Sequence, residues 1–133
     1  MTVRKDIKFL VVDDFPSMRR IITNLLRSLG YKNVITADDG AIALEIMRSE
    51  QIDFVITDWN MPNISGLELV KTIRSDEELK LTPILMVTAE SLQQNIVTAI
   101  KAGVNNYIVK PFDQESMRTK VNWILERATH LHE

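Results

Sequence analysis

Short runs of hydrophobic residues recur along this chain, and segments with helical spacing lie between them. The runs cover residues 9–12, 34–37, 54–57, 84–88 and 107–109. In these runs hydrophobic residues follow one another with little polar alternation, which is typical of a strand covered on both faces. We therefore predict five strands, each buried on both sides.

The segments between the runs predict five helices. The clearest repeats hydrophobic residues on one face, at Met18, Ile21, Ile22, Leu25, Leu26 and Leu29. Gly30 is expected to end it, because glycine enters the left-handed conformation at low cost. Two further helices are predicted for residues 41–48 and 66–74. A fourth helix is predicted to begin at Ser91, which forms a capping-box pair with Gln94, and to end at Gly103. The fifth is predicted to begin after Asp113, its N-cap.

Strands that alternate with helices predict a doubly wound α/β domain, a parallel sheet with helices on both faces. The chain has 133 residues, a length that fits one domain, so we predict a single domain over residues 1–133. The predicted strand order is 2-1-3-4-5, which makes the first and third strands neighbours.

Composition narrows the function classes. The chain has no cysteine, which excludes disulfides, thiolate metal sites and a cysteine nucleophile. Its hydrophobic runs are far shorter than the ~20 residues of a membrane span, and no secretory signal is evident. We therefore expect a cytoplasmic protein without membrane insertion. A formal net charge of −2 gives no general attraction to nucleic acid.

Polar residues follow the ends of four predicted strands. Asp13 and Asp14 follow the first strand and Asp58 the third, while Thr88 ends the fourth and Lys110 follows the fifth. Ligands of such sheets bind at the carboxyl ends of the strands. Three carboxylates gathered there favour a hard divalent ion such as Mg²⁺, and Mg²⁺ with carboxylates indicates phosphoryl chemistry. One carboxylate would then be the nucleophile that forms an aspartyl phosphate, with the hydroxyl and the ammonium group beside it.

Each of these residues also has a plain structural explanation. Asp13 or Asp14 alone could cap a helix, Thr88 could be an ordinary strand-end residue, and Lys110 a surface lysine. His130 and His132 near the end of the chain are expected in a frayed terminus, with a metal site as the alternative. The indication of a site rests on the coincidence of polar residues at several strand ends.

Six stretches carry motifs of a known family: residues 9–15 (FLVVDDF), 18–20 (MRR), 57–62 (TDWNMP), 66–69 (GLEL), 86–90 (MVTAE) and 107–112 (YIVKPF). With them the chain resembles the receiver domain of two-component response regulators over essentially its whole length. Among receivers it is most similar to the CheY-like single-domain chemotaxis regulators, and CheY is itself a known example of the 2-1-3-4-5 order.

The resemblance implies that Asp58 accepts a phosphoryl group from a CheA-type histidine kinase. Thr88 and Lys110 would bind the phosphoryl oxygens after transfer, and Pro111 would follow a cis peptide bond, which proline makes accessible. By the same resemblance, the Mg²⁺ ligands are Asp13, Asp14, Asp58 and the backbone carbonyl of Asn60.

The resemblance also implies a switch and its timing. Tyr107 matches the residue that moves inward in the active state, although a core aromatic with its hydroxyl in water would explain it as well. Asn60 and Glu90 occupy the positions that tune hydrolysis of the acyl phosphate. We expect a short-lived phosphoprotein, on which a dedicated phosphatase could also act.

The expected output is a binding surface for the flagellar motor switch protein. Its residues are Ser91, Tyr107, Val109, Phe112 and Lys120. The chain departs from the chemotaxis pattern on this surface, where Ser91, Leu92 and Gln93 replace a small residue and two lysines, Asp113 replaces a threonine and Trp123 a lysine. Fewer positive charges leave the partner open, because charge steers association.

The leading interpretation is a phosphorylation switch rather than a turnover enzyme. An alternative is a stand-alone receiver that acts as phosphate sink, phosphorelay shuttle or regulator of a non-flagellar partner. A metal-dependent phosphohydrolase is disfavoured, because it usually needs a second aspartate where Asn60 stands. A nucleotide binder is disfavoured because no glycine-rich loop follows the first strand.

Overall fold

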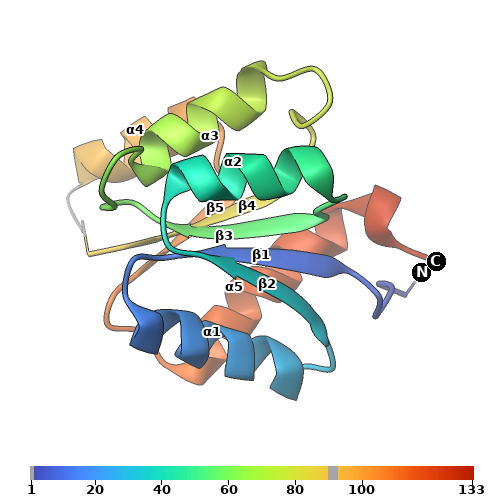
Figure 1. Cartoon of the computed structure of the whole chain (residues 1–133). Coiled ribbons are helices and arrows are strands. Elements are labelled where there is room, and N and C mark those ends of the chain that lie inside the picture. Colours follow the sequence, from blue (N-terminus) through green and yellow to red (C-terminus); the bar gives the residue numbers. More distant parts are fainter. Residues whose placement is uncertain (1, 90–92) are drawn as a thin grey trace.

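A computed structural model of the chain describes residues 2–89 and 93–133. Its centre is a parallel sheet (Figure 1) built from β1 (Lys8–Val12), β2 (Asn33–Ala37), β3 (Phe54–Asp58), β4 (Ile84–Thr88) and β5 (Asn106–Val109). The strands lie in the order β2-β1-β3-β4-β5. The predicted strands and their order are confirmed, so β1 and β3 are neighbours.

Helices cover both faces of the sheet. They are α1 (Pro16–Ser28), α2 (Gly40–Ser49), α3 (Gly66–Ser75), α4 (Gln93–Ala102) and α5 (Gln114–Arg127). In Figure 1, α1 and α5 lie on one face and α2, α3 and α4 on the other. Gly30, with a φ of 98°, follows α1 as predicted, and Asp113 caps α5 through the backbone N–H of Ser116. The predicted capping box falls on Ser91, which lies outside the described residues.

Two hydrophobic clusters hold these layers together. Between the sheet and the α1/α5 layer, Phe9 and Phe54 are fully buried, and their ring centroids are 4.9 Å apart. On the opposite face, Leu10 and Val55 pack against side chains of α2 and α3. Because β1 and β3 contribute to both clusters, their carboxyl ends are held firmly beside each other.

The prediction that every strand is buried on both sides is wrong for the two edge strands. In β2, Val34 and Ile35 are half-buried and Thr36 is exposed, and in β5 only Ile108 is buried. An edge strand has a neighbouring strand on one side only, so its outer side stays open to water. The hydrophobic runs therefore identify strands correctly but overstate burial at the edges.

The expectation of a frayed C-terminus is also wrong. After α5 a 3₁₀ turn, η1 (Thr129–Leu131), buries Leu131 in the α1/α5 cluster. His132 pairs with Val3 in an antiparallel bridge, and its Nε2 lies 2.8 Å from the carbonyl oxygen of Leu125. Figure 1 shows the two ends of the chain side by side. A buried leucine and backbone pairing hold this segment in place.

Candidate phosphorylation site

Three carboxylates meet at the carboxyl end of the sheet. Asp13 and Asp14 follow β1, and Asp58 is the last residue of β3. One oxygen from each lies within 4.8 Å of the others. Asp13 and Asp58 are buried, and Asp14 is half-buried. The predicted convergence of these three residues, called the acidic cluster below, is present.

Lys110 provides positive charge beside the acidic cluster. Its Nζ lies 3.3 Å from Asp58 Oδ1 and 3.6 Å from Asp13 Oδ2. Lys110 reaches the cluster from the segment that follows β5, and its peptide bond to Pro111 is cis. Because one ammonium group stands against three carboxylates, the cluster retains excess negative charge.

That excess changes the acidity of Asp58. Burial and the neighbouring Asp13 raise the pKa of the Asp58 carboxyl above its ordinary value, while Lys110 and the Trp59 backbone N–H act in the opposite direction. The Trp59 N–H donates to Asp58 Oδ1 at 2.9 Å. Removing water penalises the charged form, so burial outweighs both favourable contacts. A bound cation would shift this balance back.

The acidic cluster fits a divalent cation. Asp13 Oδ2 and Asp14 Oδ1 are buried, and neither accepts a hydrogen bond from any residue that the structure describes. A buried carboxylate oxygen without a donor is costly, and an ion can satisfy it. Carboxylate oxygens are the donors that Mg²⁺ prefers. The chemistry of the cluster therefore agrees with a Mg²⁺ site.

Asp13 is held from two sides. Its Oδ1 accepts the backbone N–H of Phe15 at 2.9 Å, and Arg19 donates from α1 to its backbone carbonyl at 2.6 Å. The sequence analysis includes Arg19 in the MRR stretch but assigns it no role, because the helical pattern alone does not separate it from an ordinary solvent-facing arginine. The two contacts fix both the backbone and one oxygen of Asp13.

Gly66 allows the close approach of α3 to Asp58. A Cβ at Gly66 would lie 1.9 Å from the Asp58 carbonyl oxygen, and the Gly66 N–H donates to the Trp59 carbonyl at 2.7 Å. Ser65 and Glu68 form a capping box at this helix start. The sequence held one signal for this contact: Gly66 stands at the start of a predicted helix, where no glycine is needed to end the helix.

The remaining predicted site residues lie as follows. Thr88 ends β4 and is buried, at the same edge of the sheet as the acidic cluster. Asn60 is exposed two residues after Asp58. Glu90 and Ser91 lie outside the described residues. Tyr107 is half-buried, with Lys120 Nζ 5.0 Å from its ring centroid.

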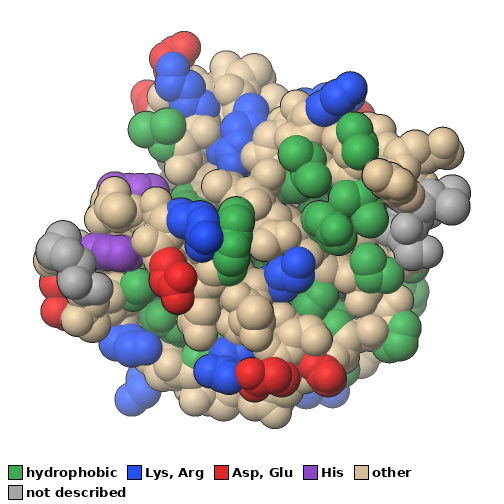
Figure 2. Space-filling model, turned by 180° about the vertical axis from the view of Figure 1, so that it is seen from behind, with side chains coloured by type: hydrophobic (Ala, Val, Ile, Leu, Met, Phe, Trp, Pro, Cys, Tyr) green, Lys and Arg blue, Asp and Glu red, His purple; other side chains and the backbone are tan. Residues whose placement is uncertain are grey.

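The described members of the expected binding surface do come together. Tyr107, Val109, Phe112 and Lys120, called the partner face below, line a hollow of about 360 Å³ between β5 and α5. Figure 2 shows the side of the molecule that carries α4, β5 and α5, where hydrophobic side chains and scattered Lys and Arg side chains lie together. On α5, Trp123 stacks under Arg127, whose guanidinium carbon is 3.8 Å from the ring centroid.

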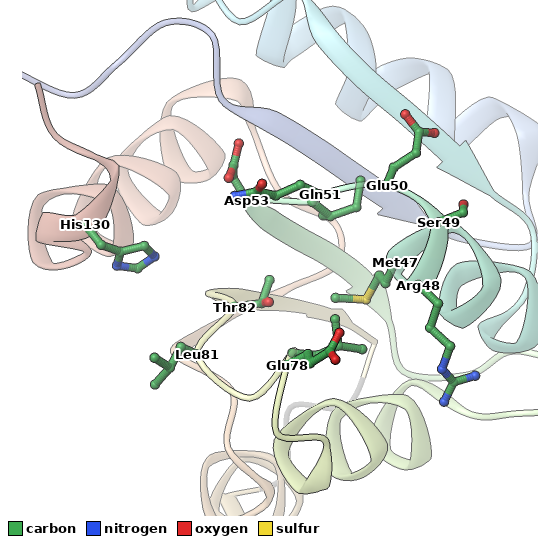
Figure 3. A pocket seen from close by; sticks show the side chains of 12 residues that line it. Met47, Arg48, Ser49, Glu50, Gln51, Asp53, Glu78, Leu81, Thr82 and His130 are labelled. Carbon is green, nitrogen blue, oxygen red and sulfur yellow. The ribbon is translucent and has the colours of Figure 1, made fainter.

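A separate hollow of about 450 Å³ lies at the opposite, amino end of the sheet. Figure 3 shows that its ionisable side chains do not converge: Glu50 and Arg48 point in opposite directions, and His130 stands apart from both. Asp53 already accepts the backbone N–H of Lys8. This hollow therefore lacks the focused chemistry of the acidic cluster.

Comparison with known proteins agrees with the geometry. The family model of the response regulator receiver domain matches residues 9–122. The chain is 52% identical over 125 residues to chemotaxis protein CheY-3 of Vibrio cholerae, covering 94% of this chain and 96% of that protein. It is 51% identical over 121 residues to chemotaxis protein CheY of Pseudomonas aeruginosa, covering 91% and 98% respectively.

A solved structure gives the same fold. The receiver domain of a sensor histidine kinase from Pseudomonas aeruginosa, which carries a magnesium ion coordinated in its active-site cleft, superposes with a TM-score of 0.81. It is 29% identical, and the match covers 91% of this chain and 98% of that one.

The acidic cluster, the sheet order and these matches define the class: this chain belongs to the response regulator receiver family. Within that family it is a receiver domain of the chemotaxis CheY type. Among the described residues, no helix is long and apolar enough to cross a membrane.

Proposed function

We propose that the chain is a chemotaxis switch in which Asp58 accepts a phosphoryl group from a CheA-type histidine kinase and thereby controls docking to the flagellar motor switch. The observation that carries this proposal is the acidic cluster with Lys110 at 3.3 Å from Asp58. The identity of 52% to a chemotaxis regulator supports the output. The protein is then cytoplasmic and needs neither nucleic acid nor a membrane.

The Mg²⁺ ion of this function is held by the acidic cluster, with the backbone carbonyl of Asn60 as the further ligand that the family resemblance implies. Asp13 Oδ2 and Asp14 Oδ1 support this assignment, since they are buried without hydrogen-bond donors among the described residues. When bound, the ion offsets the negative charge of the cluster and binds phosphoryl oxygens.

Phosphoryl transfer needs an ionised Asp58. The Trp59 N–H and Lys110 both contact Oδ1, so we assign Oδ2 as the attacking oxygen. A bond forms between Oδ2 and phosphorus as the bond from phosphorus to the kinase imidazole nitrogen breaks, and the electron pair of that bond stays on nitrogen. Lys110 and Thr88 then hold the phosphoryl oxygens.

The switch depends on a difference between two states. Phosphorylation shifts the population only if Thr88 and Lys110 contact the phosphoryl group better in one state than in the other. The pairing of β5 with β4, in which Met86 is the register partner of Tyr107 and Val109 that of Thr88, supports a switch role for Tyr107. Its inward movement would alter the partner face. Asn60 and Glu90 tune the lifetime of the phosphorylated form, with a dedicated phosphatase as a further control.

Two features of α5 also favour an output other than the flagellar motor. The stacked Trp123 and Arg127 make an aromatic surface on α5, and Asp113 has become the N-cap of that helix. Neither feature matches the lysine-rich chemotaxis pattern. A phosphate sink, a phosphorelay shuttle or a regulator of a non-flagellar partner would keep the same chemistry and change only what docks.

Intact-mass analysis after incubation with acetyl phosphate and Mg²⁺ tests the chemistry. We expect the gain of one phosphoryl group, lost when Mg²⁺ is chelated and in Asp58→Asn. Phosphorylation of Asp58→Asn to the wild-type extent would refute the assignment. Binding of a motor-switch peptide only after phosphorylation would select the flagellar output over the alternatives, and multiple turnovers on small phosphomonoesters would favour an enzyme instead.

A further inference from the structure

Arg74, in the last turn of α3, joins three segments at the amino end of the sheet. Its Nε donates to the Gly103 carbonyl at 2.8 Å, and its Nη1 donates to the carbonyls of Lys80 at 2.8 Å and Thr82 at 2.7 Å. Its Nη2 donates to Asn105 Oδ1 at 2.9 Å. We call Arg74 and these four acceptors the Arg74 network.

The Arg74 network depends on a glycine and on a shared amide. Gly103 has a φ of 118°, and a Cβ there would lie 2.7 Å from Arg74 Cγ. The Arg74 side chain therefore occupies the space that a side chain at position 103 would fill. Asn105 Oδ1 also accepts the backbone N–H of Ile84 at 2.8 Å. The segments before β4 and β5 are therefore tied to the end of α3 and to each other.

Helix α4 is attached differently from the other helices. Within the described α4, Ala99 is the one buried residue, whereas α1, α2, α3 and α5 each bury three or four. Val97 and Ile100 are exposed. Burial contributes most of the free energy that holds a helix on a sheet, so α4 is weakly held along its length. Its C-terminal end, in contrast, is bonded to Arg74 through Gly103.

From this contrast we infer that Arg74 is a positioning residue of the switch: it holds the C-terminal end of α4 in place, so that the helix turns about this end when Asp58 is phosphorylated. The inference rests on the proposed function. The start of α4 follows Thr88 closely in sequence, and Thr88 lies at the phosphorylation site. A change there reaches the N-terminal end of α4 first, and the Arg74 network keeps the far end stationary.

Partial burial of the guanidinium agrees with a fixed position. It lowers the pKa of Arg74 from its ordinary value, and all four acceptors are neutral carbonyl or amide oxygens rather than carboxylates. Such a group gives up water for several hydrogen bonds of fixed direction. A lysine at this position would have one nitrogen in place of three and could not reach all four acceptors.

We call the C-terminal end of α4, held by Arg74, the hinge. Distances between spin labels test it directly, and the chain has no native cysteine to interfere. Glu45→Cys on α2 is the reference site, paired either with Gln94→Cys at the start of α4 or with Lys101→Cys at its end; all three positions are exposed. Each pair is measured with Mg²⁺ alone and with Mg²⁺ and beryllium fluoride, which mimics the phosphoryl group. We expect the Gln94 distance to change by roughly 1–2 Å and the Lys101 distance to stay constant.

Arg74→Gln should release the end of α4, so that the Lys101 distance also changes with beryllium fluoride. Arg118→Gln is the matched control, because Arg118 is an exposed arginine bonded to Glu115 on its own helix, and it should behave like the wild type. Gly103→Ala offers a second route, since the added Cβ displaces Arg74 without removing it.

Three results would overturn the hinge. They are equal movement of both labels in the otherwise wild-type chain, no movement of either, and an unchanged Lys101 distance in both Arg74→Gln and Gly103→Ala. Trp59 fluorescence, read in a Trp123→Phe background, reports beryllium fluoride binding separately. If the otherwise wild-type chain did not bind beryllium fluoride, the proposed function itself would be refuted.

Discussion

The two ends of the sheet satisfy their charged side chains in opposite ways. At the carboxyl end, three carboxylates share one lysine, and two buried oxygens accept no hydrogen bond from a described residue. At the amino end, the Arg74 guanidinium donates four hydrogen bonds to oxygen atoms of two loops, the ones before β4 and β5. The first end is incomplete without a ligand, and the second is complete without one.

The difference follows from what the carboxyl end of the sheet has to bind. A site that must respond to a phosphoryl group has to keep some of its polar atoms unsatisfied until the ligand arrives. The Arg74 network, in contrast, ties together the segments before β4 and β5, far from the acidic cluster. Changes at the carboxyl end should therefore depend on Mg²⁺ and pH, whereas changes at the amino end should not.

The largest effect is expected for Gly66→Ala. The new Cβ would meet the Asp58 carbonyl oxygen at 1.9 Å, so backbone must move and the unfolding free energy should fall by roughly 3 kcal/mol. Asp58 would shift with it, and phosphorylation by acetyl phosphate should slow at least tenfold, roughly the effect of a small misplacement of reacting groups. Urea unfolding and intact mass measure the two effects.

Gly30→Ala is the control for that change. Its φ is 98°, but the nearest atoms belong to the flexible Lys5 side chain at 3.8 Å. We expect a loss of about 1 kcal/mol from backbone strain and normal phosphorylation. If Gly66→Ala behaved like Gly30→Ala in both assays, the close approach of α3 to Asp58 would not matter.

Arg74→Gln comes next. Loss of a charged donor to two half-buried acceptors, at Thr82 and Gly103, and two exposed ones, at Lys80 and Asn105, should lower the unfolding free energy by roughly 2 kcal/mol. The loss should be the same with Mg²⁺ and with chelator, because no acceptor belongs to the acidic cluster. The measurement is urea unfolding in both buffers, beside Arg118→Gln, for which we expect a change within about 0.5 kcal/mol. A loss that Mg²⁺ removes would contradict the separation of the two ends.

Mg²⁺ itself should stabilise the carboxyl end. At a free concentration ten times its Kd, a ligand that binds only the folded state adds about 1.4 kcal/mol to the unfolding free energy. Asp14→Asn replaces a charged carboxylate ligand with a neutral amide and should abolish most of this gain, while the unfolding free energy in chelator should not fall. Thermal unfolding with and without Mg²⁺ gives the comparison. An undiminished gain in Asp14→Asn would place the ion elsewhere.

The sequence predicted the fold and the acidic cluster for one physical reason. Buried parallel strands appear as hydrophobic runs, and a residue at the end of such a run must lie at one edge of the sheet, so Asp13, Asp58 and Lys110 were found from position alone. The Arg74 network had no such signal. Its acceptors are mostly backbone carbonyls in two loops, and their positions depend on how α3 and α4 pack.

Other errors of the sequence analysis have the same origin. Edge burial depends on which helix covers β2 and β5, a property of the assembled layers. The C-terminal segment looked frayed because His130 and His132 are polar, yet Leu131 between them is buried against the α1/α5 layer. Local patterns identify elements, whereas the contacts between distant elements require the structure.

The smallest effect, and the sharpest test of the unsatisfied end, is the pH dependence of Asp58→Asn in chelator. Burial, together with Asp13, raises the folded-state pKa of Asp58, while in the unfolded chain the group titrates near the ordinary value of about 3.9. A group with a raised folded pKa contributes stability that is present below its unfolded pKa and is lost as the pH rises through the folded pKa.

The ionised Asp58 carboxylate therefore destabilises the metal-free protein at neutral pH, and an uncharged isostere should relieve this. We expect Asp58→Asn to exceed the wild type in unfolding free energy at about pH 7, with the difference shrinking as the pH falls toward about 4. The gain should be modest, because Lys110 already offsets part of the charge. A gain that is constant across this range in urea unfolding would mean that packing, rather than the buried charge, separates the two variants.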